Sequence, residues 1–152
     1  AQQGRTGALD DAAANDGFNL VTQQTAEWNA EKAQQIVQSV IDAGTPFNVI
    51  YAENDDMAKG AVAALDKANI SHGVGKDVIV MGFDCNKWAL EELKAGNWNY
   101  DGQCNPFQAS YIDDIIKKLE NGETISEKTI IMDEKGFDAT TITQEDVDNY
   151  GI

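Results

Sequence analysis

The chain has 152 residues and a net charge of -15, with 11 Lys and Arg against 26 Asp and Glu. This length fits one domain, and 42% hydrophobic residues is an ordinary share for a globular core, so neither disorder nor a fibrous repeat is expected. A surface this acidic repels phosphate and has no basic stripe, which argues against nucleic acid and anionic membranes as partners.

Membrane insertion is not expected either. The longest charge-free apolar stretch lies near residues 78–83 and falls far short of the roughly 20 residues that a membrane helix needs. No secretion leader precedes Ala1, so we expect either that the mature protein begins here or that upstream sequence is missing.

Composition also argues against several classes of enzyme. His72 is the single histidine, so histidine metal clusters are impossible, and a catalytic role for His72 is not expected. Neither a GxxxxGK[ST] nor a GxGxxG phosphate loop occurs. Cys85 and Cys104 are too few for a disulfide scaffold and have no CxxC spacing. The sequence therefore predicts a protein that is not an enzyme and that needs no cofactor or metal.

In chain order, the first predicted element is a helix over residues 6–14. An α/β unit normally places a strand before such a helix, so its absence predicts an N-terminal truncation. Three apolar runs, 18–23, 48–52 and 78–83, read as buried strands whose starts are 30 residues apart, the size of a βαβ unit. Between them, helices are predicted over 29–43, with Asn29 as N-cap and Gly44 as the stop, and over 56–68, with Asp55 as cap.

The same alternation continues to the end of the chain. A helix is predicted over 87–94, a strand over 100–104, a helix over 107–120 with an apolar stripe for packing, and a last strand over 129–132. The pattern predicts an α/β fold, a three-layer sandwich with a mainly parallel sheet covered on both faces, in a single domain spanning 1–152.

In such a sheet, ligands bind beyond the carboxyl ends of the strands. The residues that follow the predicted strands combine carboxylate, amide and indole groups, which together suit a neutral polyhydroxylated ligand. Each also has a plainer interpretation, because Asp55, Asp56 and Asp84 are suited to cap helices and Trp28 to pack. These residues are Thr25, Ala26, Glu27 and Trp28; Glu53, Asn54, Asp55 and Asp56; Asp84 and Cys85; and Asn105 and Pro106.

Three motifs in this order resemble a known family. The run from Ile50 to Leu65 (IYAENDDMAKGAVAAL), then Val80 to Asp84 (VMGFD) and Cys104 to Pro106 (CNP), is similar to the type 1 periplasmic sugar-binding proteins of ABC transporters, the ribose, galactose and galactofuranose binders. The resemblance runs from about residue 5 to 152 and covers only the second, C-terminal lobe of such a protein, one Rossmann-like lobe. It implies that the N-terminal lobe is absent.

The resemblance also assigns ligand-binding roles. Arg5 matches a helix-borne arginine, although Ala8 and Leu9 replace the Gly-Phe pair that follows it in the family. Asn54 and Asp84 match the residues that bind sugar hydroxyls, and Trp28 matches an aromatic of the cleft.

At the end of the fourth predicted strand, Cys104 stands where many members of the family have glutamine. The Cys-Asn-Pro form resembles the galactofuranose-type branch instead. This leaves Gln103, Cys104 and Asn105 as alternative contacts. The family fold makes the strands beside Cys85 and Cys104 neighbours, so either a disulfide or two free thiols is expected.

The function that the resemblance implies is a solute-binding component that holds a monosaccharide between two lobes and delivers it to an ABC transporter permease. Its location would be extracytoplasmic, either periplasmic or as a cell-surface lipoprotein. The sensor domain of a LacI-type repressor is an alternative with the same cleft. A phosphoacceptor domain using Asp55, Asp56, Asp84 and Lys135 is a weaker one, because the order of these acids relative to the strands is wrong for that class.

Overall fold

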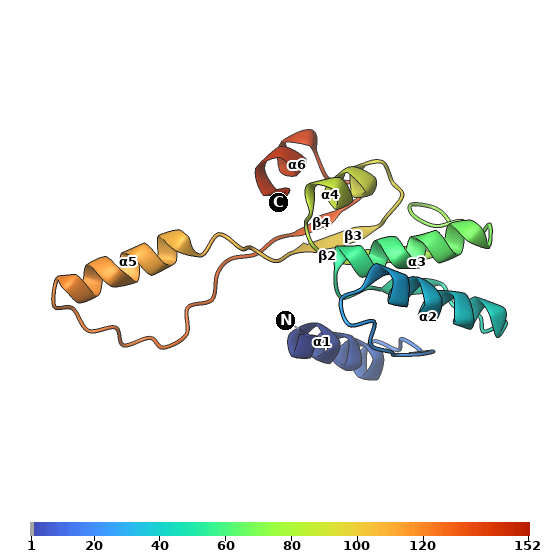
Figure 1. Ribbon diagram of the computed structural model, residues 1–152, viewed down its shortest axis with the longest axis horizontal. Coiled ribbons are helices and arrows are strands. Elements are labelled where there is room, and N and C mark those ends of the chain that lie inside the picture. Colours follow the sequence, from blue (N-terminus) through green and yellow to red (C-terminus); the bar gives the residue numbers. More distant parts are fainter. Residues whose placement is uncertain (1) are drawn as a thin grey trace.

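A computed structural model describes residues 2–152 of the chain and contains one mixed sheet (Figure 1). The strand order is β1-β2-β3-β4. The first three strands are parallel, and β4 is antiparallel to β3. The strands are β1 (Val49–Tyr51), β2 (Ile79–Asp84), β3 (Tyr100–Gln103) and β4 (Gly136–Asp138).

Helices cover both sides of this sheet. Figure 1 shows α4 and α6 on one side of the strands and α2 and α3 on the other, so the predicted α/β architecture with a mainly parallel sheet is confirmed. None of the helices in residues 2–152 has the length and apolar character to cross a membrane. The helices are α1 (Gln2–Asn15), α2 (Ala30–Asp42), α3 (Asp55–Lys67), α4 (Lys87–Lys94), α5 (Ala109–Glu120) and α6 (Gln144–Tyr150).

The ends of α2 follow the predicted local chemistry. The Asn29 side chain accepts a hydrogen bond from the Lys32 amide at 2.9 Å, and Gly44 adopts a left-handed φ of 67° just after the helix. For α3 the predicted cap was wrong by one residue. Asn54, not Asp55, caps the helix by accepting from the Met57 amide, and Asp55 is the first helical residue.

The core lies where α3 and α4 meet the central strand. Its largest buried side chains are apolar and come from α3, β2, α4 and the turn before β3, which explains why these elements hold together. They include Leu65, Val80, Leu90, Leu93 and Trp98.

Two of the predicted strands are wrong. Residues 18–23 are exposed and pair with no strand, and residues 129–132 are part of a long connection. An apolar run becomes a strand only when a neighbour completes its hydrogen bonds, and within residues 2–152 β1 pairs with β2 alone. The last strand is instead the short β4, centred on the buried Phe137.

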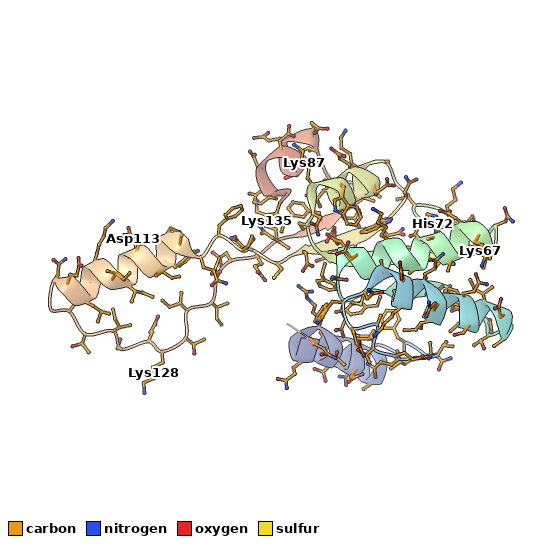
Figure 2. All side chains as sticks on the ribbon, in the orientation of Figure 1. Lys67, His72, Lys87, Asp113, Lys128 and Lys135 are labelled. Carbon is orange, nitrogen blue, oxygen red and sulfur yellow. The ribbon has the colours of Figure 1, made fainter. Side chains whose placement is uncertain are left out.

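Residues 106–133, here called the arm, project from the sheet (Figure 1). The arm carries α5, which has an apolar stripe as predicted but no buried residue, so the prediction of a packing helix is wrong for the described chain. Figure 2 shows Asp113 and Lys128 far out on the arm and Lys135 near its base. At the base, the Gln103 amide donates to the Lys135 carbonyl at 2.8 Å, which joins the two ends of the arm.

Gly60 marks the closest approach of α3 to α2. A Cβ atom there would lie 2.0 Å from the backbone carbonyl oxygen of Ala30. Backbone cannot yield as a side chain does, so we expect Gly60→Ala to lower the free energy of unfolding by about 3 kcal/mol, the upper part of the range for overpacking. Urea unfolding followed by circular dichroism measures this change.

Gly7 of α1 provides the matched control. A Cβ atom on Gly7 meets nothing within 4 Å, so Gly7→Ala should stabilise the helix by about 0.5–1 kcal/mol. Equal stability of the two variants would contradict the close packing of α2 on α3.

Candidate functional site

The candidate site lies where the three parallel strands end. β1 leads into Glu53 and Asn54, and β2 ends at Asp84. β3 ends at Gln103, which lies opposite Asp84 in the sheet register. Because the carboxyl ends of parallel strands meet at one edge, the loops that follow them come together there.

Arg5 of α1 is the centre of this polar cluster. Its guanidinium donates to Asp84 Oδ1 at 3.0 Å and to the Glu53 carbonyl oxygen, and it stacks 4.8 Å from the centroid of the Phe83 ring. The Arg5 side chain is only 12% exposed and that of Asp84 28%. The structure therefore brings two of the predicted site residues, Arg5 and Asp84, into direct contact.

Further contacts fix α1 against the ends of β1 and β2. The Tyr51 hydroxyl donates to the Arg5 carbonyl at 3.1 Å, and the Thr6 hydroxyl donates to the Glu53 carboxylate. Tyr51 and Phe83 pack edge to face with ring centroids 5.3 Å apart. Burial raises the pKa of Tyr51, so its hydroxyl remains a donor at neutral pH. The sequence predictions missed Tyr51, Phe83 and Thr6, although the first two lie at the ends of predicted strands.

Asn54 is 8% exposed and lies between Glu53 and the start of α3. Its side-chain oxygen caps the helix, and its amide nitrogen donates no hydrogen bond within residues 2–152. Asn54 therefore has a structural contact on one side-chain atom and a free donor on the other.

Trp28 lies before α2 and is 45% exposed. It lines an open groove of about 770 Å³ formed by α1, residues 18–28, α2 and β1. Thr6, Tyr51 and Glu53 line the same groove, which links Trp28 to the polar cluster, whereas Arg5, Asn54 and Asp84 lie outside the lining.

At the end of β3, Gln103 is engaged by the base of the arm. Its side-chain oxygen accepts from the Lys135 amide at 3.2 Å. Cys104 is partly exposed, and the Asn105 amide donates to Glu134 at 2.8 Å. Cys85 and Cys104 are both free thiols, so the second of the two alternatives for this pair holds.

The backbone is strained in two of these loops. Among residues 2–152, the non-glycine residues with positive φ other than Asn69 are Glu27 and Trp28, at 52° and 60°, and Asp84 and Cys85, at 115° and 62°. Such conformations cost on the order of 1–3 kcal/mol each and gather at binding sites. Both candidate loops therefore hold strained backbone at a predicted ligand contact, Trp28 in one loop and Asp84 in the other.

His72 lies outside this site, near the far end of α3 (Figure 2). Its ring nitrogens lie 2.9 Å from the Asn97 carbonyl oxygen and 3.0 Å from the Asp66 carboxylate. The side chain thus ties the loop after α3 to the turn before β3. Within residues 2–152, no three His, Cys, Asp or Glu side chains gather in a way that would hold a metal ion.

Charged, amide and aromatic groups gathered beyond the strand ends are typical of ligand-binding α/β domains. Residues 1–123 match the family model described as "Periplasmic binding protein domain". The chain belongs to this family.

Curated relatives and solved structures agree with this assignment. The fructose import binding protein FruE of Bifidobacterium longum is 31% identical over 132 residues, which are 86% of this chain and 38% of that protein. The ribose import binding protein RbsB of Bacillus subtilis is 32% identical over 81 residues, 53% of this chain and 25% of that protein.

Among solved structures, an ABC transporter periplasmic solute-binding protein from Actinobacillus succinogenes with bound D-allose is 29% identical, with a TM-score of 0.78. The match covers 98% of this chain and 50% of that one. The chain thus spans half or less of the length of these relatives.

Proposed function

We propose that this chain is the C-terminal lobe of an extracytoplasmic solute-binding component of an ABC transporter. It binds a monosaccharide in the cleft between itself and an N-terminal lobe, and the loaded protein delivers the sugar to a permease. In this proposal Arg5, Trp28, Asn54 and Asp84 contact the sugar, and Gln103 or Cys104 adds a contact from the end of β3.

The observation that carries the proposal is the contact between Arg5 and Asp84 at the ends of β1 and β2. A guanidinium donates to sugar hydroxyls and a carboxylate accepts from them, and such bonds to charged groups are worth about 1.5–3 kcal/mol each. The exposed Trp28 ring adds an apolar plate for the C–H face of a sugar ring. The charges of Arg5 and Asp84 already neutralise each other, so the site does not require a charged ligand.

Two exposed apolar surfaces favour the presence of a second lobe. The stripe of α5 on the arm is exposed, and stripes of this kind bury themselves against another element. The groove beside β1 is lined mainly by apolar side chains and runs along the edge of β1 that no strand of residues 2–152 pairs with, where a further strand would fit. Since the chain spans about half the length of its structural neighbours, the remainder of such a protein can supply both partners.

The proposed mechanism is a population shift. Sugar contacts both lobes only in the closed state, so its differential affinity favours closure, and no chemical step is needed. A single lobe would supply half of the contacts and bind weakly. A repressor sensor domain would close in the same way, but the import binding proteins among the relatives support transport.

Calorimetric titration of the two-lobe protein tests the proposal. Pentoses, hexoses and furanoses are titrated in turn, with an amino acid and a phosphate ester as controls from other ligand classes. We expect saturable binding of at least one neutral sugar and of neither control. Binding of a control ligand, with no sugar bound, would refute the assignment.

A further inference from the structure

Two carboxyl groups are buried together beneath the candidate site. Asp55 of α3 and Asp101 of β3 are both fully buried, at 0% exposure. Both lie beside Gly82 of β2, because Asp101 is the register partner of Gly82 and a Cβ atom on Gly82 would lie 2.7 Å from Asp55 Oδ1. Asp55 Oδ1 and Asp101 Oδ2 are buried and accept no hydrogen bond from any group of residues 2–152. Two carboxylate oxygens cannot hydrogen-bond unless one of them carries a proton.

The surroundings offer no counter-charge for two anions. No salt bridge of residues 2–152 includes either side chain. Arg5 on α1 is paired with Asp84, Lys87 on α4 with Asp148, and Lys59 on α3 lies over the Trp88 ring.

Space around the pair is also filled. A Cβ atom on Gly82 would lie 2.7 Å from Asp55 Oδ1 and 2.8 Å from the Trp98 ring. The glycine thus lets the backbone of β2, the Trp98 indole and the Asp55 carboxyl group pack directly against one another. This packing leaves no room for a hydrated cation between Asp55 and Asp101, so a proton is the partner that neutralises one of the two carboxylates.

The donors around the pair differ, and this difference assigns the charge. Asp55 Oδ2 accepts two hydrogen bonds from Asn86, one from its backbone amide at 2.8 Å and one from its side chain at 3.1 Å. The side-chain donor to Asp101 is the Cys85 thiol, a weak donor, at 3.8 Å. These donors favour the negative charge on Asp55 and the proton on Asp101.

We propose that Asp55 and Asp101 share one proton in the folded protein and that this pair positions the turn from Asp84 to Asn86 for ligand binding. The Asp55 carboxylate holds Asn86 directly, two residues after Asp84, in a turn where Asp84 and Cys85 both have left-handed φ. Asp55 and Asp101 are positioning residues, and their effect on the ligand rests on the proposed function of Asp84.

The proton makes stability depend on pH. Burial, followed by the charge of Asp55, raises the pKa of Asp101, and burial also raises that of Asp55, with a smaller contribution from the charge of Asp84. The folded state therefore keeps a proton that the unfolded state releases above its ordinary carboxyl pKa of 3.8. This contribution is complete below that pKa and is lost as the pH rises towards the folded pKa of Asp101.

Asp101→Asn tests the shared proton, because its amide can donate to Asp55 at every pH. At about pH 8 we expect the melting temperature of the two-lobe Asp101→Asn protein to exceed that of the wild type by at least about 5 °C, and at about pH 5 we expect the two to converge. Asp11→Asn, at an exposed position of α1, makes the same change in net charge and should follow the wild type at both pH values. Equal curves for wild type and Asp101→Asn would overturn the proposal.

A measurement on the wild-type protein does not depend on a variant that folds. Carbon-13 NMR of the aspartate carboxyl groups should show one carboxyl that stays protonated at neutral pH and whose signal is missing in Asp101→Asn. If all carboxyls titrate near the ordinary value, the shared proton is refuted. The proposed function is tested separately, because sugar titration of the same samples can fail while the protonated carboxyl is still observed.

The positioning role has its own readout. Sugar affinity of the wild type should fall as the pH rises through the loss of the shared proton, and the affinity of Asp101→Asn should stay constant over the same range. Parallel pH profiles in a protein that binds sugar would overturn the positioning role.

Discussion

Replacing Asp84 with alanine should weaken sugar binding by the two-lobe protein at least about 10-fold, and on the order of 100-fold where both carboxylate oxygens accept from hydroxyls. Oδ1 of Asp84 accepts from Arg5, and Oδ2 accepts no hydrogen bond within residues 2–152, so it is free for a ligand. The change also leaves the partly buried Arg5 guanidinium without its carboxylate partner. Isothermal titration calorimetry measures the dissociation constant.

Two further variants separate charge from shape. Asp84→Asn keeps one acceptor and the size of the side chain, so its loss should be smaller than that of Asp84→Ala. Asp148→Ala removes an exposed carboxylate of α6 that pairs with Lys87 of α4, away from Arg5 and Asp84. This variant should bind sugar as the wild type does. Wild-type affinity in Asp84→Ala would contradict the site.

Local sequence rules identified the helices well because their determinants lie within each segment. The cap at Asn29 and the left-handed Gly44 need only neighbouring residues, and the predicted helix 87–94 matches the bounds of α4. At α3 the same rule predicted Asp55, whereas Asn54 is the cap, since both side chains can cap a helix.

Strands were harder to predict because pairing decides them. Residues 18–23 and 129–132 have the right apolar pattern, but neither finds a partner strand in the described chain. The short β4 has a single buried apolar side chain, Phe137, and forms because it faces β3 in register. A strand of three residues is too short for an alternating pattern to indicate it.

The candidate site was partly predictable for the same reason. Strand ends placed Asp84 and Asn54 on one edge, and the family resemblance added Arg5, which the structure joins to Asp84. Tyr51 and Thr6 were missed because their contacts depend on how α1 docks. Asp101 was missed because a charged residue is ordinarily expected at the surface, and local sequence does not show that it lies buried beside Gly82 and Asp55.

Trp98 and Trp28 should have different roles: replacing Trp98 should mainly lower stability, and replacing Trp28 should mainly weaken sugar binding. This side chain is 2% exposed, packs edge to face on Trp88 at 5.9 Å and covers Gly82. Trp98→Ala removes a large buried ring and should lower the free energy of unfolding by about 3–5 kcal/mol, a large share of the 5–15 kcal/mol of an ordinary domain. Urea unfolding of the two-lobe protein measures this cost.

Trp28→Ala is the matched comparison, because the same atoms are removed from a ring that is 45% exposed. Its cost in unfolding free energy should be clearly smaller, about 1–2 kcal/mol, since the ring buries less surface than that of Trp98. Its sugar affinity should nevertheless fall several-fold, because the aromatic plate is gone. If Trp28→Ala instead destabilised the fold as strongly as Trp98→Ala and left affinity unchanged, Trp28 would be a packing residue and the ring would have no place in the sugar site.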